Sequence, residues 1–290
     1  MPFWISIGLL SVGQGAVVAM PRALRIPGLE RLSGRGWAAV PALSVIGFVF
    51  GVRAATDGSA EGLTYLALVA VPLLAMVALG GLARGARPLL ALVAVPLFVL
   101  AWADRSGLGG QAAACVLSGL SCVTLGVLLA AVTPARWLAV GIVLMAGADC
   151  VLVVSSLLQQ PNDALNAAQP GAGLPQLQSE SLGSAVMGYG DLFVAGAFGG
   201  LLAARGSYRV QWRAAALTAA LALVFDCAFF LVDELPATVP VALALVILEI
   251  SSRYRRRAGR RAVQLPVGVR PPGRVRAPRA GGYTEKTPSR

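Results

Sequence analysis

The chain of 290 residues is too apolar and too poor in charge to be a soluble globular protein. Hydrophobic residues make up 57% of the sequence and charged residues 13%, and the mean hydropathy is +0.75. Soluble domains carry roughly 25% charged residues, so the composition predicts a protein that crosses a membrane several times. Histidine is absent, which excludes histidine metal sites, Ser–His triads and haem ligation by imidazole.

Nine apolar runs predict an all-α polytopic membrane protein with about nine transmembrane helices. They cover residues 3–20, 37–52, 62–83, 88–103, 111–132, 137–157, 185–204, 213–232 and 236–250. A helix needs about 20 residues to cross a bilayer, so the fourth and ninth runs are short. The four cysteines lie in these runs without CxxC spacing, which is typical of buried small residues rather than of a metal site.

The distribution of basic residues predicts the orientation of the chain. All but two of the 24 Lys and Arg fall in alternate connections or in the C-terminal tail; the exceptions are Arg53 and Arg105. By the positive-inside rule, the N-terminus lies outside and the C-terminus in the cytoplasm, and we expect a plasma (cytoplasmic) membrane location.

The same pattern divides the chain into three parts. We expect residues 1–136 to form an N-terminal five-helix scaffold, 137–250 a second membrane region of four helices (six to nine), and 251–290 a basic, disordered cytoplasmic tail. The tail is expected to touch anionic lipid, and no nucleic-acid partner is expected. The connection 159–184 is either a flexible external loop or a substrate-gating element.

Two aspartates lie inside neighbouring apolar runs, where a charged carboxylate costs roughly 2.5–3.5 kcal/mol. Asp149 lies about 12 Å below the outer surface in the sixth run, and Asp191 about 9 Å below it in the seventh. Two carboxyl groups held together in a low dielectric cannot both ionise, so they share a proton. Such a pair can hydrolyse a peptide bond with water and needs neither metal nor cofactor.

The residues around these aspartates are suited to an extended peptide. Gly188 and Gly190 remove side chains next to Asp191, with Tyr189 between them. Pro236 suits the first turn of the ninth run, and Ala237 beside it is small. Backbone groups around Pro236 would be open to hydrogen bonds from a substrate strand.

These motifs resemble those of the intramembrane aspartyl proteases of the presenilin and signal peptide peptidase (GxGD) family. That family carries Tyr-Asp, Gly-x-Gly-Asp and Pro-Ala-Leu on its sixth, seventh and ninth spans. The resemblance covers roughly the last half of the chain, and residues 190–198 are most similar to the signal peptide peptidase branch. It implies that Asp149 and Asp191 are the catalytic dyad and that Pro236, Ala237 and Thr238 position the substrate.

The resemblance also has consequences for the substrate. Ala148 stands where the family has tyrosine, and Thr238 where it has leucine, so these two positions bear on substrate preference. The predicted orientation is that of signal peptide peptidase. It implies transmembrane peptide substrates whose N-terminus lies in the cytoplasm. The oligomeric state is not predicted.

A third intramembrane carboxyl group, Asp226, leaves other interpretations open. It acts either as a structural brace or as an auxiliary carboxyl group for the dyad. A proton-coupled transporter would use the three aspartates as a relay. A prepilin-peptidase-like enzyme, also of the GxGD type, and an inactive membrane scaffold are the remaining alternatives.

Overall fold

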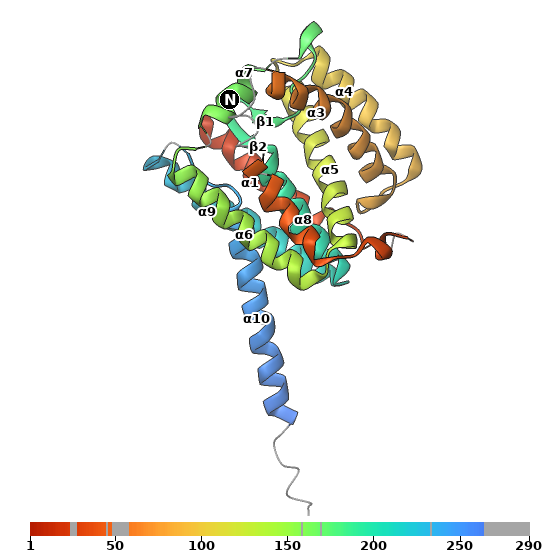
Figure 1. Ribbon diagram of the computed structural model, residues 1–290, viewed down its shortest axis with the longest axis vertical. Coiled ribbons are helices and arrows are strands. Elements are labelled where there is room, and N and C mark those ends of the chain that lie inside the picture. The colour runs from red at the N-terminus through yellow and green to blue at the C-terminus, as the bar shows by residue number, and fades with distance from the viewer. Residues whose placement is uncertain are drawn as a thin grey trace, which may run out of the picture. The chain divides into compact units, whose positions relative to one another are not determined.

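The computed structural model describes residues 1–23, 28–44, 46–47, 58–157, 159–168, 170–232 and 234–263. Helices form almost all of the regular structure in these residues (Figure 1). The α-helices are α1 Phe3–Ala19, α3 Gly58–Val77, α4 Ala94–Ala103, α5 Leu108–Val132, α6 Ala135–Val154, α7 Gln159–Ala167, α8 Tyr189–Ala204, α9 Tyr208–Asp226 and α10 Val239–Val263. Shorter 3-10 or π helices are η1 Leu29–Leu32, η2 Arg35–Ala39, η3 Ala78–Leu82, η4 Pro88–Val93, η5 Gly171–Gly173 and η6 Cys227–Phe230. The strands β1 Ser179–Leu182 and β2 Ala185–Gly188 form an antiparallel hairpin.

The described residues contain four helical stretches that are long and apolar enough to cross a membrane. They are Glu61–Leu82, Leu108–Val132, Ala135–Val154 and Tyr208–Phe230. Three apolar helices are shorter, namely Phe3–Ala19, Pro88–Ala103 and Tyr189–Ala204. The prediction of nine spans is therefore wrong in number, whereas an all-α, multi-pass membrane protein is supported. The predicted span 37–52 lies partly outside the described residues.

Local structure explains where the predicted spans fail. The seventh run begins as strand β2, so α8 starts only at Tyr189. The ninth run begins as a turn, and α10 starts at Val239. This helix continues through residues 251–263 of the predicted tail, and residues 264–290 lie outside the described residues. The connection 159–184 holds α7, η5 and β1 and is not an unstructured loop.

The outer faces of the long helices are apolar. Leu66, Val69, Leu73 and Val77 recur at helical spacing along α3, and each is at least half exposed. A stripe of this kind is unfavourable in water and favourable against lipid. The exposed apolar face of α3 is therefore suited to contact with lipid, as the composition of the chain predicts.

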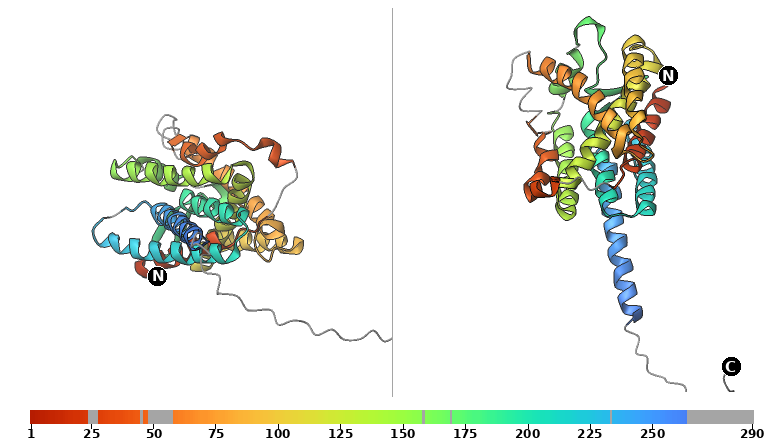
Figure 2. Two further views of the ribbon diagram at one scale, coloured as in Figure 1. Left: turned by 90° about the horizontal axis from the view of Figure 1, so that it is seen from below. Right: turned by 90° about the vertical axis from the view of Figure 1, so that its right-hand side faces the viewer.

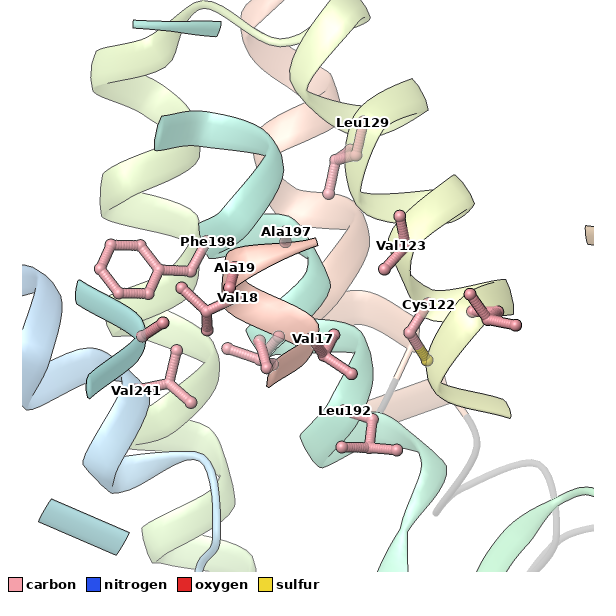
Figure 3. Packing of buried hydrophobic residues seen from close by; sticks show 14 of the residues in the cluster. Val17, Val18, Ala19, Cys122, Val123, Leu129, Leu192, Ala197, Phe198 and Val241 are labelled. Atoms are coloured by element: carbon pink, nitrogen blue, oxygen red, sulfur yellow. The ribbon is translucent and has the colours of Figure 1, made fainter. Parts of the chain in front are cut away.

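Helix α8 is the centre of the unit Met1–Glu249. It packs against α1, α5, α6, α9 and β2, and Figure 2 shows it enclosed by its neighbours when the molecule is seen from below. Every residue from Val194 to Ala203 is buried, as expected of a helix that is apolar on all sides. Phe198 and Leu192 of α8 lie among side chains of α1, α5 and α10 (Figure 3).

Glycines allow α5 and α8 to touch through their backbones. A Cβ added at Gly126 would lie 2.1 Å from the carbonyl oxygen of Gly196. Added at Gly196 or Gly200, it would lie 2.2 Å or 2.3 Å from a carbonyl oxygen of α5. Gly196 and Gly200 are four residues apart, which is the small-xxx-small spacing of close helix pairs in membranes.

Basic residues that were predicted to lie in the cytoplasm gather where α1 ends. Pro21 and Ala83 form an antiparallel bridge, and the Arg84 guanidinium donates to the carbonyl of Ala19 (3.0 Å). Arg84 also donates to the side chain of Gln211 and lies 4.3 Å from the centre of the Tyr208 ring. Because Gln211 in turn donates to Val18 and Pro21, this cluster closes one end of the helix bundle.

The glycine contact gives the first prediction. Gly126→Ala should lower the free energy of unfolding by about 1–3 kcal/mol or more, because the new methyl group must separate α5 from α8. Gly147→Ala, on the exposed side of α6 with no atom within 4 Å, should be neutral or stabilise by up to about 1 kcal/mol. Thermal unfolding in detergent micelles measures both. Equal effects of the two substitutions would contradict the close contact.

Candidate active site

The two predicted catalytic aspartates lie on adjacent helices. Asp149 is near the C-terminal end of α6, and Asp191 is in the first turn of α8. Helix α6 packs on α8, so the helices that carry the two carboxyl groups are neighbours. By surface exposure, Asp149 is buried and Asp191 is intermediate.

One oxygen atom of each carboxyl group is held in place. The Thr238 hydroxyl donates to Oδ2 of Asp149 (2.6 Å), and the backbone N–H of Gly188 donates to Oδ2 of Asp191 (3.1 Å). The second bond also caps the first turn of α8. One hydrogen bond to each carboxyl group thereby helps to orient it.

The segment Pro236–Thr238 is fixed by α1 and by the start of α10. Gln14 of α1 donates to the carbonyl of Ala237 (2.8 Å), while the carbonyls of Pro236 and Thr238 accept N–H groups of α10. Thr238 is 1% exposed. Thr238, one of the two positions at which this chain departs from the motifs it resembles, therefore donates a hydroxyl group directly to Asp149.

Tyr189 contacts helix α5, whereas Gly188 lies against the carboxyl group of Asp191. The Tyr189 hydroxyl is 2.7 Å from Oγ of Ser121, and its backbone carbonyl accepts from Sγ of Cys122, so Tyr189 joins α8 to α5. A Cβ at Gly188 would lie 3.1 Å from Oδ2 of Asp191 and would crowd the carboxyl group. Gly190 is the remaining residue between Tyr189 and Asp191, in the first turn of α8.

Asp226 is bound to α1 at the end of α9. It accepts a hydrogen bond from the Ser11 hydroxyl (2.7 Å). Ser11 and Gln14 lie one turn apart on α1, so a single helix holds both Asp226 and the Ala237 carbonyl. This contact is of the kind expected for a structural brace.

The sequence did not point to Glu180, which lies on β1 next to this site. Glu180 is fully buried, and among the described residues neither of its carboxyl oxygens has a hydrogen bond of ordinary geometry. Burial, and then the negative charge of Asp191, raise the pKa of Glu180 to about 8, a rise that the nearby Ser118 hydroxyl partly offsets. Acidic residues are common in the connections between membrane spans, so the sequence gives no sign that Glu180 is buried. Only the folded β1–β2 hairpin shows its burial.

A polar stripe on α5 holds the hairpin in place. Gln111 accepts from the N–H of Gly183 (2.7 Å), Cys115 donates to the carbonyl of Ser181, and Ser118 to that of Leu177. These α5 residues recur at helical spacing, so they face the hairpin together. The hairpin that leads into Asp191 is therefore attached to the same helix that packs on α8.

Compared with protein-family models, with curated proteins and with solved structures, the chain gives no match. Among the described residues, no cluster of three or more Cys, Asp and Glu side chains is placed to hold a metal ion.

Burial of Glu180 makes stability depend on pH. Between pH 4.5, the ordinary value for glutamate, and about 8, the unfolded chain has lost this proton while the folded chain keeps it. The free energy of unfolding should therefore fall by roughly 1.4 kcal/mol per pH unit through this group. Glu180→Gln should remove that part of the slope, as measured by unfolding midpoints in micelles from pH 5 to 8.

The matched control is Glu61→Gln, the same chemical change at an exposed position at the start of α3. It should leave the pH dependence as it is in the unaltered chain. A Glu180→Gln slope equal to that of the control would mean that Glu180 is not buried as a neutral acid.

Proposed function

We propose that the chain is an intramembrane aspartyl protease that hydrolyses peptide bonds within transmembrane segments. The observation that carries the proposal is that Asp149 and Asp191 lie on two helices that pack against each other, and that one oxygen of each carboxyl group accepts a hydrogen bond. Its further support is the likeness of residues 188–191 and 236–237 to the GxGD family motifs.

The chemistry needs one proton shared between the two carboxyl groups. The ionised carboxylate takes a proton from water while the protonated one donates to the scissile carbonyl oxygen, and the water oxygen bonds to the carbonyl carbon. The product is a neutral tetrahedral diol. When its C–N bond breaks, the nitrogen takes the proton that the first carboxylate had accepted. One diol hydroxyl gives its proton back to the second carboxylate as its oxygen becomes a carbonyl oxygen, so the dyad returns to its starting state.

The surroundings of the dyad suit an extended substrate. Strand β2 pairs with β1 on one side only and ends at Gly188, directly before the catalytic segment. An unpaired strand edge can bind a peptide through main-chain hydrogen bonds. The fixed segment Pro236–Thr238 lies next to Asp149, so it would contact the other side of such a peptide.

A proton-coupled transporter fits this arrangement less well. Asp149 accepts a hydrogen bond from Thr238, and Asp191 lies directly after the β1–β2 hairpin. Asp226 and the carbonyl of Ala237 both accept hydrogen bonds from α1. Asp226 and Asp149 are thus connected through neighbouring residues of α1 and through the segment Ala237–Thr238. The substrate orientation, with a cytoplasmic N-terminus, and the plasma-membrane location belong to the same proposal and depend on the arginine distribution.

The dyad is tested by isosteric substitution. Asp149→Asn and Asp191→Asn should each abolish cleavage of a transmembrane peptide, because an amide can neither accept the proton from water nor share one. Asp226→Asn, the matched change at the third carboxyl group, should keep measurable turnover. Product formation in micelles, with thermal unfolding as a check of folding, reads out all three. Full activity in either dyad variant would refute the assignment.

The Thr238 hydroxyl gives a second test at the same site. A hydrogen bond to a charged group contributes about 1.5–3 kcal/mol. Thr238→Val, which removes only the hydroxyl, should therefore lower kcat about 10- to 100-fold with little change in KM. Thr238→Ser keeps the donor and should retain most of the activity. If valine and serine at this position behaved alike, the bond to Asp149 would have no catalytic role.

A further inference from the structure

Gln14 is a buried polar residue within the apolar helix α1. Its side chain is 0% exposed, and its Nε2 group donates to the carbonyl oxygen of Ala237 (2.8 Å). Burying an amide is unfavourable unless its polar atoms are bonded, and among the described residues Oε1 of Gln14 has no hydrogen bond. The side chain is therefore costly to bury, and the bond that it does make is to the segment beside the predicted site.

The packing of α1 on α9 fixes the place from which Gln14 donates. A Cβ added at Gly15 would lie 2.8 Å from the carbonyl oxygen of Ala215, so the two helices are in close contact next to Gln14. Ser11, one turn earlier on α1, donates to Asp226 at the end of α9 (2.7 Å). Helix α1 is thus attached to α9 at residues on both sides of Gln14 in the sequence.

The segment that Gln14 holds is a turn and not part of a helix. Residues 236–238 precede α10, and their first and last carbonyls accept N–H groups of that helix. The middle carbonyl, of Ala237, accepts from Gln14. The next residue, Thr238, donates its hydroxyl to Asp149 (2.6 Å). Two consecutive residues of one turn are therefore bonded to α1 on one side and to Asp149 on the other.

We propose that Gln14 is a positioning residue for the aspartyl site: by holding the Ala237 carbonyl, it keeps the Thr238 hydroxyl at hydrogen-bond distance from Asp149. Gln14 acts on the reaction through Thr238. This inference rests on the proposed protease function, and it extends the site to the N-terminal helix, outside the half of the chain that carries the family resemblance.

The first experiment measures kcat and KM for a transmembrane peptide in micelles. Gln14→Met removes the amide at nearly constant volume and should lower kcat about 2- to 10-fold with little change in KM, because one neutral hydrogen bond is lost. The matched control is Ser11→Ala, which removes the other hydrogen bond from α1 and should leave kcat unchanged. Thermal unfolding checks folding, and Gln14→Asn, whose amide is one methylene shorter, replaces the methionine variant if that one does not fold.

A double-mutant cycle tests whether Gln14 acts through Thr238. In Thr238→Val the hydroxyl that Gln14 positions is absent, so adding Gln14→Met should change kcat by less than about 2-fold. Independent effects would instead multiply. The inference would be overturned by an equal loss of kcat in the two backgrounds, or by an unchanged kcat in Gln14→Met alone.

The second experiment does not require proteolysis. Amide hydrogen exchange of the full chain in micelles, read by mass spectrometry, follows the N–H groups of Val239 and Ala242, which bond to the carbonyls of Pro236 and Thr238. Both should exchange faster in Gln14→Met than in the unaltered chain, because the turn that they bond to has lost its contact with α1. Ser11→Ala should leave their exchange unchanged. Equal exchange in Gln14→Met and in the control would overturn the inference.

The two experiments separate the two proposals. Faster exchange in Gln14→Met without any peptide cleavage would support the hold of Gln14 on the turn and refute the protease. Cleavage that depends on both aspartates, with independent effects in the cycle and unchanged exchange, would support the protease and refute the role of Gln14.

Discussion

The close contact of α5 with α8 is the constraint on which the site depends. Three glycines bring the two backbones together, and no larger residue fits at these positions without moving a helix. Since lipid is as apolar as the helix surfaces, this packing cannot come from the hydrophobic effect and relies on close contact and hydrogen bonds. The contact fixes where α8 begins, and Asp191 lies in its first turn.

The same helix α5 also determines how the chain enters α8. Its polar side chains hold the β1–β2 hairpin, and Ser121 and Cys122 hold Tyr189 at the start of α8. A flexible connection at this point would leave Asp191 poorly oriented. Reacting groups must be held within fractions of an ångström for efficient catalysis, so an attached hairpin serves such a site better than a free loop does.

Helix α1 has the corresponding role on the other side of the dyad. Ser11 and Gln14 are polar residues in an apolar helix. Ser11 donates a hydrogen bond to Asp226, and Gln14 donates one to the carbonyl of Ala237. Helix α1 holds Ala237, and the next residue, Thr238, donates a hydrogen bond to Asp149, so α1 is linked to Asp149 through this segment. The Ser11 hydroxyl and the side-chain N–H of Gln14 are thus bonded, whereas, among the described residues, Oε1 of Gln14 and both carboxyl oxygens of Glu180 have no hydrogen bond of ordinary geometry.

The sequence by itself determined the class of protein and singled out two aspartates within apolar runs. Composition decides whether a chain prefers lipid, and a carboxyl group in an apolar run is conspicuous, so Asp149 and Asp191 could be singled out without a structure. The number of spans could not be obtained in this way. Hydropathy does not distinguish strand β2 from the first turn of a helix, nor a turn at 236–238 from the start of α10.

Tertiary structure alone decided which groups meet. Thr238 and Asp149 are 89 positions apart, and Gln14 and Ala237 are 223 apart, so neither hydrogen bond leaves a local pattern. The burial of Glu180 likewise arises from the folding of the hairpin onto α5, and an acid in a connection gives no sign of it. Residue types and periodicity report on local preference, whereas desolvation and pairing depend on which distant segments exclude water together.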